Sequence, residues 1–238
     1  MTEHCFCLVF GTSAAPIHLG HNELIVKATL ALEQKEHLVA RVVILPVYWR
    51  HNISDEVKKS LQESYEDRLA LCQIAAGEIA TQLGRPSKWV EVSRLEKTLS
   101  LLSGQPNYTV ETLKVMREEL KENERLAFLL GADSVSGASP RLGHWYELDD
   151  LLHLTSFVVS PRDGFPPNLK FIKKLGRQGA EVIYLDEVDT ADISSSTIRK
   201  TLIETNDPQK VVRSGWLSQQ ALDYILDHNM IEQWQNQV

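Results

Sequence analysis

The sequence predicts an α/β fold, in which a doubly wound parallel sheet carries helices on both faces and a small helical extension follows at the C-terminus. The first supporting observation is that short apolar runs alternate with amphipathic helical segments along most of the chain. The second is that these runs lack a regular apolar–polar alternation, which is typical of strands buried on both faces of a sheet. A third is that the runs end at glycines or in polar loops.

The apolar runs define the expected strands. They cover residues 5–10, 41–46, 89–92, 126–130, 157–160 and 182–185, and Gly11 and Gly131 directly follow the first and the fourth. A strand that is followed by a helix and then by another strand folds back in parallel, with a right-handed crossover. The expected sheet is therefore Rossmann-like.

The helical segments have apolar residues at helical spacing. We expect helices at residues 20–36, 55–83, 109–122, 167–178, 195–204 and 218–228, with Thr109 as an N-cap and Gly84 as a stop signal. No repeat or long linker interrupts the pattern. We therefore expect one domain over residues 1–238, with the C-terminal helical part at about 194–238.

Composition limits the partners of the chain. Its 238 residues carry a net charge of −7, which disfavours a general nucleic-acid-binding surface because such surfaces need clustered Lys and Arg. No apolar stretch approaches the roughly 20 residues that span a bilayer, and the N-terminus lacks the basic start of a secretory signal. Cys5, Cys7 and Cys72 form no disulfide framework. We expect a cytoplasmic protein without nucleic-acid or membrane partners.

The loop after the first expected strand carries a pair of histidines. His18 and His21 are three residues apart where a helix begins, so both side chains can face one point. Gly20 lets a base or a phosphate approach the backbone. Imidazoles that are protonated or that donate hydrogen bonds suit the charge of a triphosphate. The alternatives are a surface helix cap and a two-histidine metal site, but no nearby residue completes a metal ligand set.

A second polar segment opens the helix after the last expected strand. Ser194, Ser195 and Ser196 offer hydroxyl groups and free backbone amides at a helix N-terminus. Arg199 comes round to the same side and can grip a phosphate with two hydrogen bonds. The alternative is a serine-rich cap followed by a surface arginine.

Together, His-x-Gly-His at residues 18–21 and Ile-Ser-Ser-Ser-x-Ile-Arg at residues 193–199 resemble the paired signature of the nucleotidylyltransferase superfamily. The likeness is to its nicotinate/nicotinamide mononucleotide adenylyltransferase branch in particular. That resemblance implies that this pair of segments binds the ATP phosphates and stabilises the transition state. The implied residues are His18, His21, Ser195, Ser196 and Arg199.

Further segments match the same branch in order, from about residue 6 to residue 230. Tyr-Thr-x-x-Thr-Leu at residues 108–113, Gly-x-Asp-Ser at residues 131–134, a tryptophan at 145 and an arginine turn at 161–164 resemble the family's segments. The resemblance implies that Thr109 and Trp145 border the pyridine, and that Gly131 and Asp133 hold adenosine. Arg162 would contact a phosphate or the nicotinate carboxylate, or support its turn. The implied nucleotide loop is Gly11, Thr12 and Ser13.

The chain also departs from the family pattern. Ala14 and Ala15 replace a Phe-Asp pair, and the second glycine of the first loop is missing. Residues 47–52 replace a Pro-Pro-His stretch, and residues 142–144 are extra. These departures keep open a sister nucleotidylyltransferase with another phosphate acceptor, and a non-catalytic nucleotide-binding protein on the same fold.

The expected reaction moves AMP from ATP to nicotinate or nicotinamide mononucleotide, which yields the dinucleotide of NAD biosynthesis and pyrophosphate. A phosphate monoester is already a nucleophile, so no covalent intermediate is required. Mg²⁺ is expected on the ATP phosphates rather than in a protein metal site. We also expect a homo-oligomer.

Overall fold

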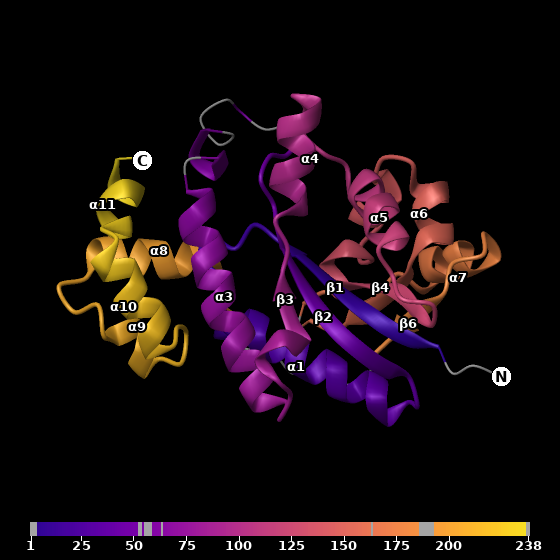
Figure 1. Cartoon of the computed structure of the whole chain (residues 1–238), viewed down its shortest axis with the longest axis horizontal. Coiled ribbons are helices and arrows are strands. Elements are labelled where there is room, and N and C mark those ends of the chain that lie inside the picture. The colour runs from indigo at the N-terminus through magenta and orange to yellow at the C-terminus, as the bar shows by residue number, and fades with distance from the viewer. Residues whose placement is uncertain are drawn as a thin grey trace.

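A six-stranded parallel sheet forms the centre of the molecule, with the strand order β3-β2-β1-β4-β5-β6 (Figure 1). The computed structural model describes residues 4–51, 54, 59–62, 64–162, 164–185 and 193–236. Its strands are β1 Cys5–Thr12, β2 Leu38–Pro46, β3 Val90–Val92, β4 Glu124–Gly131, β5 Ser156–Ser160 and β6 Val182–Tyr184. All neighbouring strands pair in parallel, so the predicted doubly wound sheet is confirmed.

Helices cover both faces of this sheet (Figure 1). The helices before the C-terminal part are α1 Leu19–Gln34, α3 Tyr65–Gln82, α4 Leu95–Ser103, α5 Thr109–Glu118, α6 Leu148–Leu154 and α7 Leu169–Arg177. Those of the C-terminal part are α8 Ser195–Glu204, α9 Lys210–Arg213, α10 Gln219–Asp227 and α11 Met230–Gln235. None of the helices in the described part of the chain is long and apolar enough to cross a membrane.

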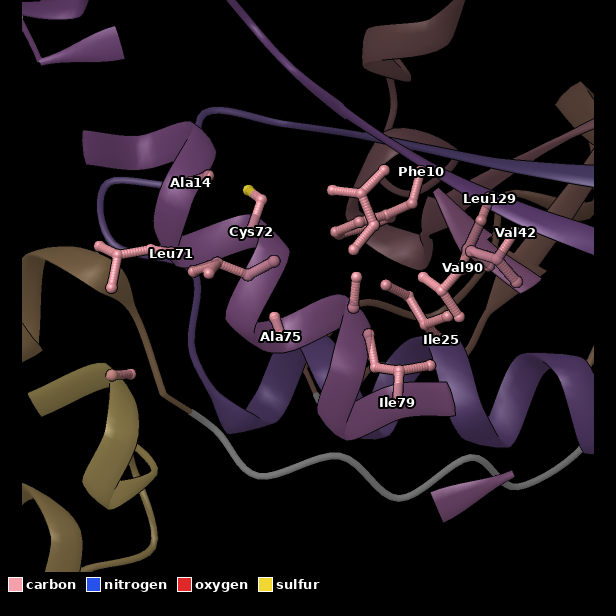
Figure 2. Packing of buried hydrophobic residues seen from close by; sticks show 14 of the residues in the cluster. Phe10, Ala14, Ile25, Val42, Leu71, Cys72, Ala75, Ile79, Val90 and Leu129 are labelled. Atoms are coloured by element: carbon pink, nitrogen blue, oxygen red, sulfur yellow. The ribbon is translucent and has the colours of Figure 1, made fainter. Parts of the chain in front are cut away.

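Alternate residues of the central strands pack into two separate hydrophobic cores, one on each face of the sheet. Leu8 points to the face that α1, α3 and the C-terminal helices cover, whereas Val9 points to the face under α5, α6 and α7. Figure 2 shows Ile25 of α1 and Ile79 of α3 in the first core, and both side chains are fully buried. Truncating such a residue to alanine costs about 2–5 kcal/mol. The apolar runs of the sequence are therefore explained by burial on both faces.

The C-terminal helices belong to the first core. Leu202, Leu222 and Trp234 are buried in the same cluster as α1 and α3. The Tyr224 hydroxyl group donates to Asp67 of α3 over 3.1 Å. The predicted helical extension is confirmed, and it packs against the sheet-covering helices rather than standing apart.

Several expected element bounds differ from the structure. Part of the expected helix 55–83 lies outside the described residues, and α3 runs from Tyr65 to Gln82. The assignment of Thr109 as an N-cap is wrong. Tyr108 holds that position, and its backbone N–H donates to the Glu111 carboxylate over 2.7 Å, so Thr109 is the first helical residue. The helix that begins there ends at Glu118, before residue 122.

The sequence patterns also missed short helices. α4 spans nine residues and α6 seven, which is too short for a clear apolar period. In α4 the apolar pattern is also misleading, because Leu101 and Leu102 are exposed. α11 follows α10 after a left-handed residue, Asn229, and lies beyond the last expected helix.

Candidate active site

A cleft of about 420 Å³ lies at the carboxyl ends of β1, β4 and β5. The strand order reverses between β1 and β4, so the cleft occupies the switch point where such sheets bind ligands. Eleven residues proposed from the sequence line it: Gly11, Thr12, Ser13, His18, Gly20, His21, Gly131, Asp133, Arg162, Ser194 and Ser195. A larger hollow of about 660 Å³ between α6 and α7 contains none of them.

The two histidines lie side by side at the start of α1. Their ring centroids are 3.8 Å apart, and His18 is only 7% exposed. The backbone N–H of His18 donates to Nδ1 of His21 over 3.3 Å. In the neutral ring, this hydrogen bond places the His21 proton on Nε2. His21 is therefore held as a hydrogen-bond donor through Nε2.

Both imidazoles are neutral at pH 7 in the free protein. Burial, and then the positive charge of Arg162, lower the pKa of His18 to about 4. Burial holds the pKa of His21 well below its ordinary value, and His18 and Arg162 lower it further. Of the two states considered from the sequence, protonated or donating, the structure supports donation by neutral rings.

Side chains of α3 and α8 hold the loop after β1 through its carbonyl groups. Arg68 of α3 donates to the Ser13 carbonyl over 2.8 Å, and Arg199 of α8 donates to that of Ala15. The Ser195 hydroxyl group donates to the Pro16 carbonyl over 2.8 Å. These contacts fix the loop in which the family's second glycine is missing.

Within that loop, Ala14 adopts a left-handed backbone with φ of 49°, which few non-glycine residues do. Its N–H donates to the Thr12 hydroxyl group over 3.1 Å. Arg68, which is only 1% exposed, was not recognised from the sequence as part of the site. An arginine in an amphipathic helix gives no indication that its guanidinium reaches a loop 55 residues away.

The hydroxyl groups of Ser194, Ser195 and Ser196 make different contacts. Ser194 caps α8 by accepting the Thr197 N–H over 3.1 Å, while Ser195 binds the first loop. Ser196 is exposed and lies 2.9 Å from the Ser194 hydroxyl oxygen. Ser196 and Arg199 are not part of the cleft wall, so Ser194 and Ser195 are the polar residues that the described part of this segment contributes to it.

Asp133 is held in the cleft by a residue that the sequence did not single out. Arg141 begins a short 3₁₀ helix, Arg141–His144, and its Nη1 lies 2.6 Å from Asp133 Oδ2. The other carboxylate oxygen folds back over Gly131, where an added Cβ would come within 2.6 Å of it. Gly131 thus leaves room for the carboxylate.

Gly20 has a packing role that differs from the expected one. An added Cβ would lie 2.9 Å from Ile193 Cγ2 and 3.2 Å from His18 Nδ1. The missing side chain therefore makes room for the His18 ring and for Ile193. Gly20 also lines the cleft, as expected.

Thr109 and Trp145 lie outside the cleft lining. Trp145 is partly buried and packs edge-on against Phe128, with ring centroids 5.9 Å apart. Thr109 follows Tyr108, whose ring stacks between those of His51 and Tyr146 at centroid distances of 3.6 and 4.0 Å. An aromatic cluster thus surrounds the beginning of α5.

No group of three or more metal-binding side chains occurs among the described residues. The three cysteines are free thiols, and burial raises the pKa values of Cys7 and Cys72 to about 12. These two thiols pack as small apolar side chains. Asp133 is the one carboxylate that the described residues contribute to the cleft wall.

Comparison with known proteins gives consistent results. A probable nicotinate-nucleotide adenylyltransferase of Stenotrophomonas maltophilia (strain K279a) is 29% identical over 171 residues, which cover 71% of this chain and 67% of the relative. A relative of the same description from Yersinia pestis (strain Pestoides F) is 25% identical over 213 residues, with 84% and 85% covered.

Among solved structures, the nicotinic acid mononucleotide adenylyltransferase of Plasmodium falciparum, complexed with NaAD, shares the fold. The TM-score is 0.70 at 18% identity, with 96% of this chain and 98% of that chain covered. A family model described as cytidylyltransferase-like matches residues 9–201, which include the cleft residues from Phe10 to Ser195. The chain therefore belongs to the cytidylyltransferase-like family.

Proposed function

We propose that this protein transfers AMP from MgATP to nicotinate mononucleotide, releasing pyrophosphate. The observation that carries the proposal is the pair of neutral histidines at the start of α1, the buried His18 and the partly buried His21, beside Arg162 and above the switch point of the sheet. Such preorganised donors stabilise charge that develops in a transition state. The names of the relatives support the choice of acceptor.

In the proposed reaction, a phosphate oxygen of the mononucleotide attacks the α-phosphorus of ATP. The new P–O bond forms as the bond to the β-phosphate oxygen breaks, and the electron pair leaves with pyrophosphate. The nucleophile is already an anion, so a general base is not needed. Catalysis then depends on alignment of the reactants and on neutralisation of charge.

The histidines supply hydrogen bonds to the phosphates in this mechanism. Nδ1 of His21 is occupied by a backbone N–H, so Nε2–H is the group that can donate to a phosphate oxygen. Arg162 supplies positive charge on the same wall, and after burial this charge is a further cause that lowers both histidine pKa values. A bound triphosphate would oppose that effect and favour protonation of the rings.

Ser195, Ser196 and Arg199 are assigned to the departing pyrophosphate. Ser195 already lies in the cleft wall, at the N-terminus of α8. Arg199 lies behind the first loop on the Ala15 carbonyl, so this role requires its guanidinium to leave that contact when the phosphates are bound. Otherwise Arg199 acts by holding the loop.

The remaining assignments concern the two nucleosides. Asp133 offers carboxylate oxygens to the adenosine ribose, and Gly11, Thr12 and Ser13 line the nucleotide. Thr109 and Trp145 border the acceptor pyridine, beside the aromatic cluster at the start of α5. Mg²⁺ enters as part of the ATP substrate, where it neutralises phosphate charge and keeps most of its waters. This fits a cleft wall with a single described carboxylate.

The test is release of pyrophosphate from ATP and Mg²⁺ with separate acceptors: nicotinate mononucleotide, nicotinamide mononucleotide and phosphopantetheine. We expect release with nicotinate mononucleotide and a loss of about 10²- to 10³-fold in turnover on His21→Ala. His228→Ala is the matched control, because His228 stacks on Tyr224 in the C-terminal part. Release only with phosphopantetheine would support a sister enzyme, and tight ATP binding without release would support a nucleotide-binding protein.

A further inference from the structure

Arg141 is the part of the cleft that the proposed reaction leaves without a role. It is one of two described arginines in the cleft wall, and its side chain is 69% exposed. It is carried by the 3₁₀ helix Arg141–His144, within the stretch between Asp133 and Trp145 that holds extra residues. The Arg141 guanidinium thus reaches the cleft from a segment that lies outside the sheet.

The Asp133 carboxylate is bound by Arg141 through one oxygen and lies close to Gly131 with the other. Oδ2 accepts from Arg141 Nη1 at 2.6 Å, a charge-assisted hydrogen bond, while Oδ1 lies close over Gly131. Each carboxylate oxygen has more than one acceptor position, so both can still accept a hydroxyl group. Without Arg141, the carboxylate would be free to rotate away from Gly131.

We propose that Arg141 is a positioning residue that orients Asp133 to accept the ribose hydroxyl groups of the donor nucleotide. Arg141 would thereby determine the preference for ribose over deoxyribose. This inference rests on the proposed function only in that the donor is ATP. It predicts that the effect of Arg141 depends on the ribose hydroxyl groups and not on the phosphates.

The test compares the dissociation constants of ATP and of dideoxy-ATP, measured by titration calorimetry without acceptor. The two ligands carry the same base and charge, so a general loss of positive charge weakens both equally. We expect Arg141→Met to reduce the preference for ATP over dideoxy-ATP about threefold to fivefold, which corresponds to the upper range for one exposed ion pair. Arg141→Lys should restore part of the preference.

Arg213→Met is the matched control, because Arg213 is an exposed arginine paired with Asp207 in the C-terminal part. Its preference for ATP should equal that of the wild type. In an Asp133→Asn background, Arg141→Met should change the preference by less than about twofold, because the two residues act as a unit. If Arg141→Met weakens the binding of ATP and of dideoxy-ATP equally, or leaves the preference between them unchanged, the inference is overturned.

The outcome is separable from that of the proposed reaction. If the preference changes as expected but no pyrophosphate is released with either pyridine mononucleotide, the inference holds and the proposed reaction is wrong. If pyrophosphate is released but the preference is insensitive to Arg141, only the inference is wrong. A wild-type protein that binds both ligands equally would also overturn the role of Arg141.

Discussion

Glu96 places a buried carboxyl group between α4 and α5, and replacing it with Gln should stabilise the protein at alkaline pH. Glu96 is 7% exposed, and one oxygen accepts the Thr112 hydroxyl group over 3.0 Å. Burial raises the pKa of this carboxyl group from an ordinary 4.5 to about 7. The difference corresponds to about 3 kcal/mol of unfolding free energy.

The sign follows from the direction of this pKa change. Stability from protonated Glu96 is fully present below pH 4.5 and is lost as the pH rises through about 7. At pH 8 the wild type buries a charge, whereas a Gln side chain stays neutral and still accepts from Thr112. We expect Glu96→Gln to raise the unfolding free energy by about 3 kcal/mol at pH 8 and to change it little at pH 4.5.

The measurement is thermal and urea unfolding of both proteins across this pH range. For a protein of this size the shift corresponds to a rise in Tm of roughly 6–12 °C at pH 8. Glu118→Gln, at an exposed position of α5, is the control and should have little effect. A Glu96→Gln protein that is less stable than wild type at pH 8 would refute the reasoning, because ionised Glu96 would then be stabilising.

Wild type and variant must be compared because the two cleft histidines change the unfolding free energy with pH in the direction opposite to Glu96. The pKa of His18 is lowered to about 4, so its contribution is present above the ordinary pKa of 6.5 and is lost as the pH falls through 4. His21 changes in the same direction. Over pH 4–7 these contributions offset that of Glu96, so the wild-type profile alone does not reveal either.

Three further predictions concern the cleft. In NMR titrations of the free protein, the rings of His18 and His21 should stay neutral from pH 6 to 8, because both pKa values lie below that range. A titration midpoint near 6.5 in either ring would contradict this account of their burial. Arg68→Met should lower the unfolding free energy in urea by about 2–4 kcal/mol and raise the KM for ATP more than Arg68→Lys does, because the carbonyl groups of Ser13 and Leu61 lose their donor. An unchanged urea midpoint would rule this out. Gly20→Ala should destabilise the folded protein by about 1–3 kcal/mol and lower kcat, because the added Cβ would press against Ile193 and the His18 ring. A variant with the kcat of the wild type would argue against this packing.

Much of the fold could be predicted because burial leaves a direct trace in the sequence. The runs around Leu8 and Leu129 are apolar throughout since both faces of the sheet are covered. Short elements leave a weaker trace. α4 and α6 span only two to three turns, and the exposed Leu101 and Leu102 of α4 conceal which side of that helix is buried.

The candidate site could be predicted where its residues follow strands or begin helices. His18, His21, Asp133 and Ser195 meet in one cleft because the carboxyl ends of parallel strands share one edge. Arg68 and Arg141 could not be recognised in this way. Their roles depend on where long side chains end in three dimensions, on the Ser13 carbonyl and the Asp133 carboxylate, and local patterns do not encode those contacts.

The most direct test of the proposed chemistry follows the α-phosphate of ATP. Wild-type protein and the His21→Ala variant are incubated with Mg²⁺, nicotinate mononucleotide and ATP labelled at the α-phosphate, and the products are separated. The account predicts that the label enters the pyridine dinucleotide with one pyrophosphate released per dinucleotide, and that His21→Ala slows this step about 10²- to 10³-fold. ATP binding without formation of labelled dinucleotide would contradict it.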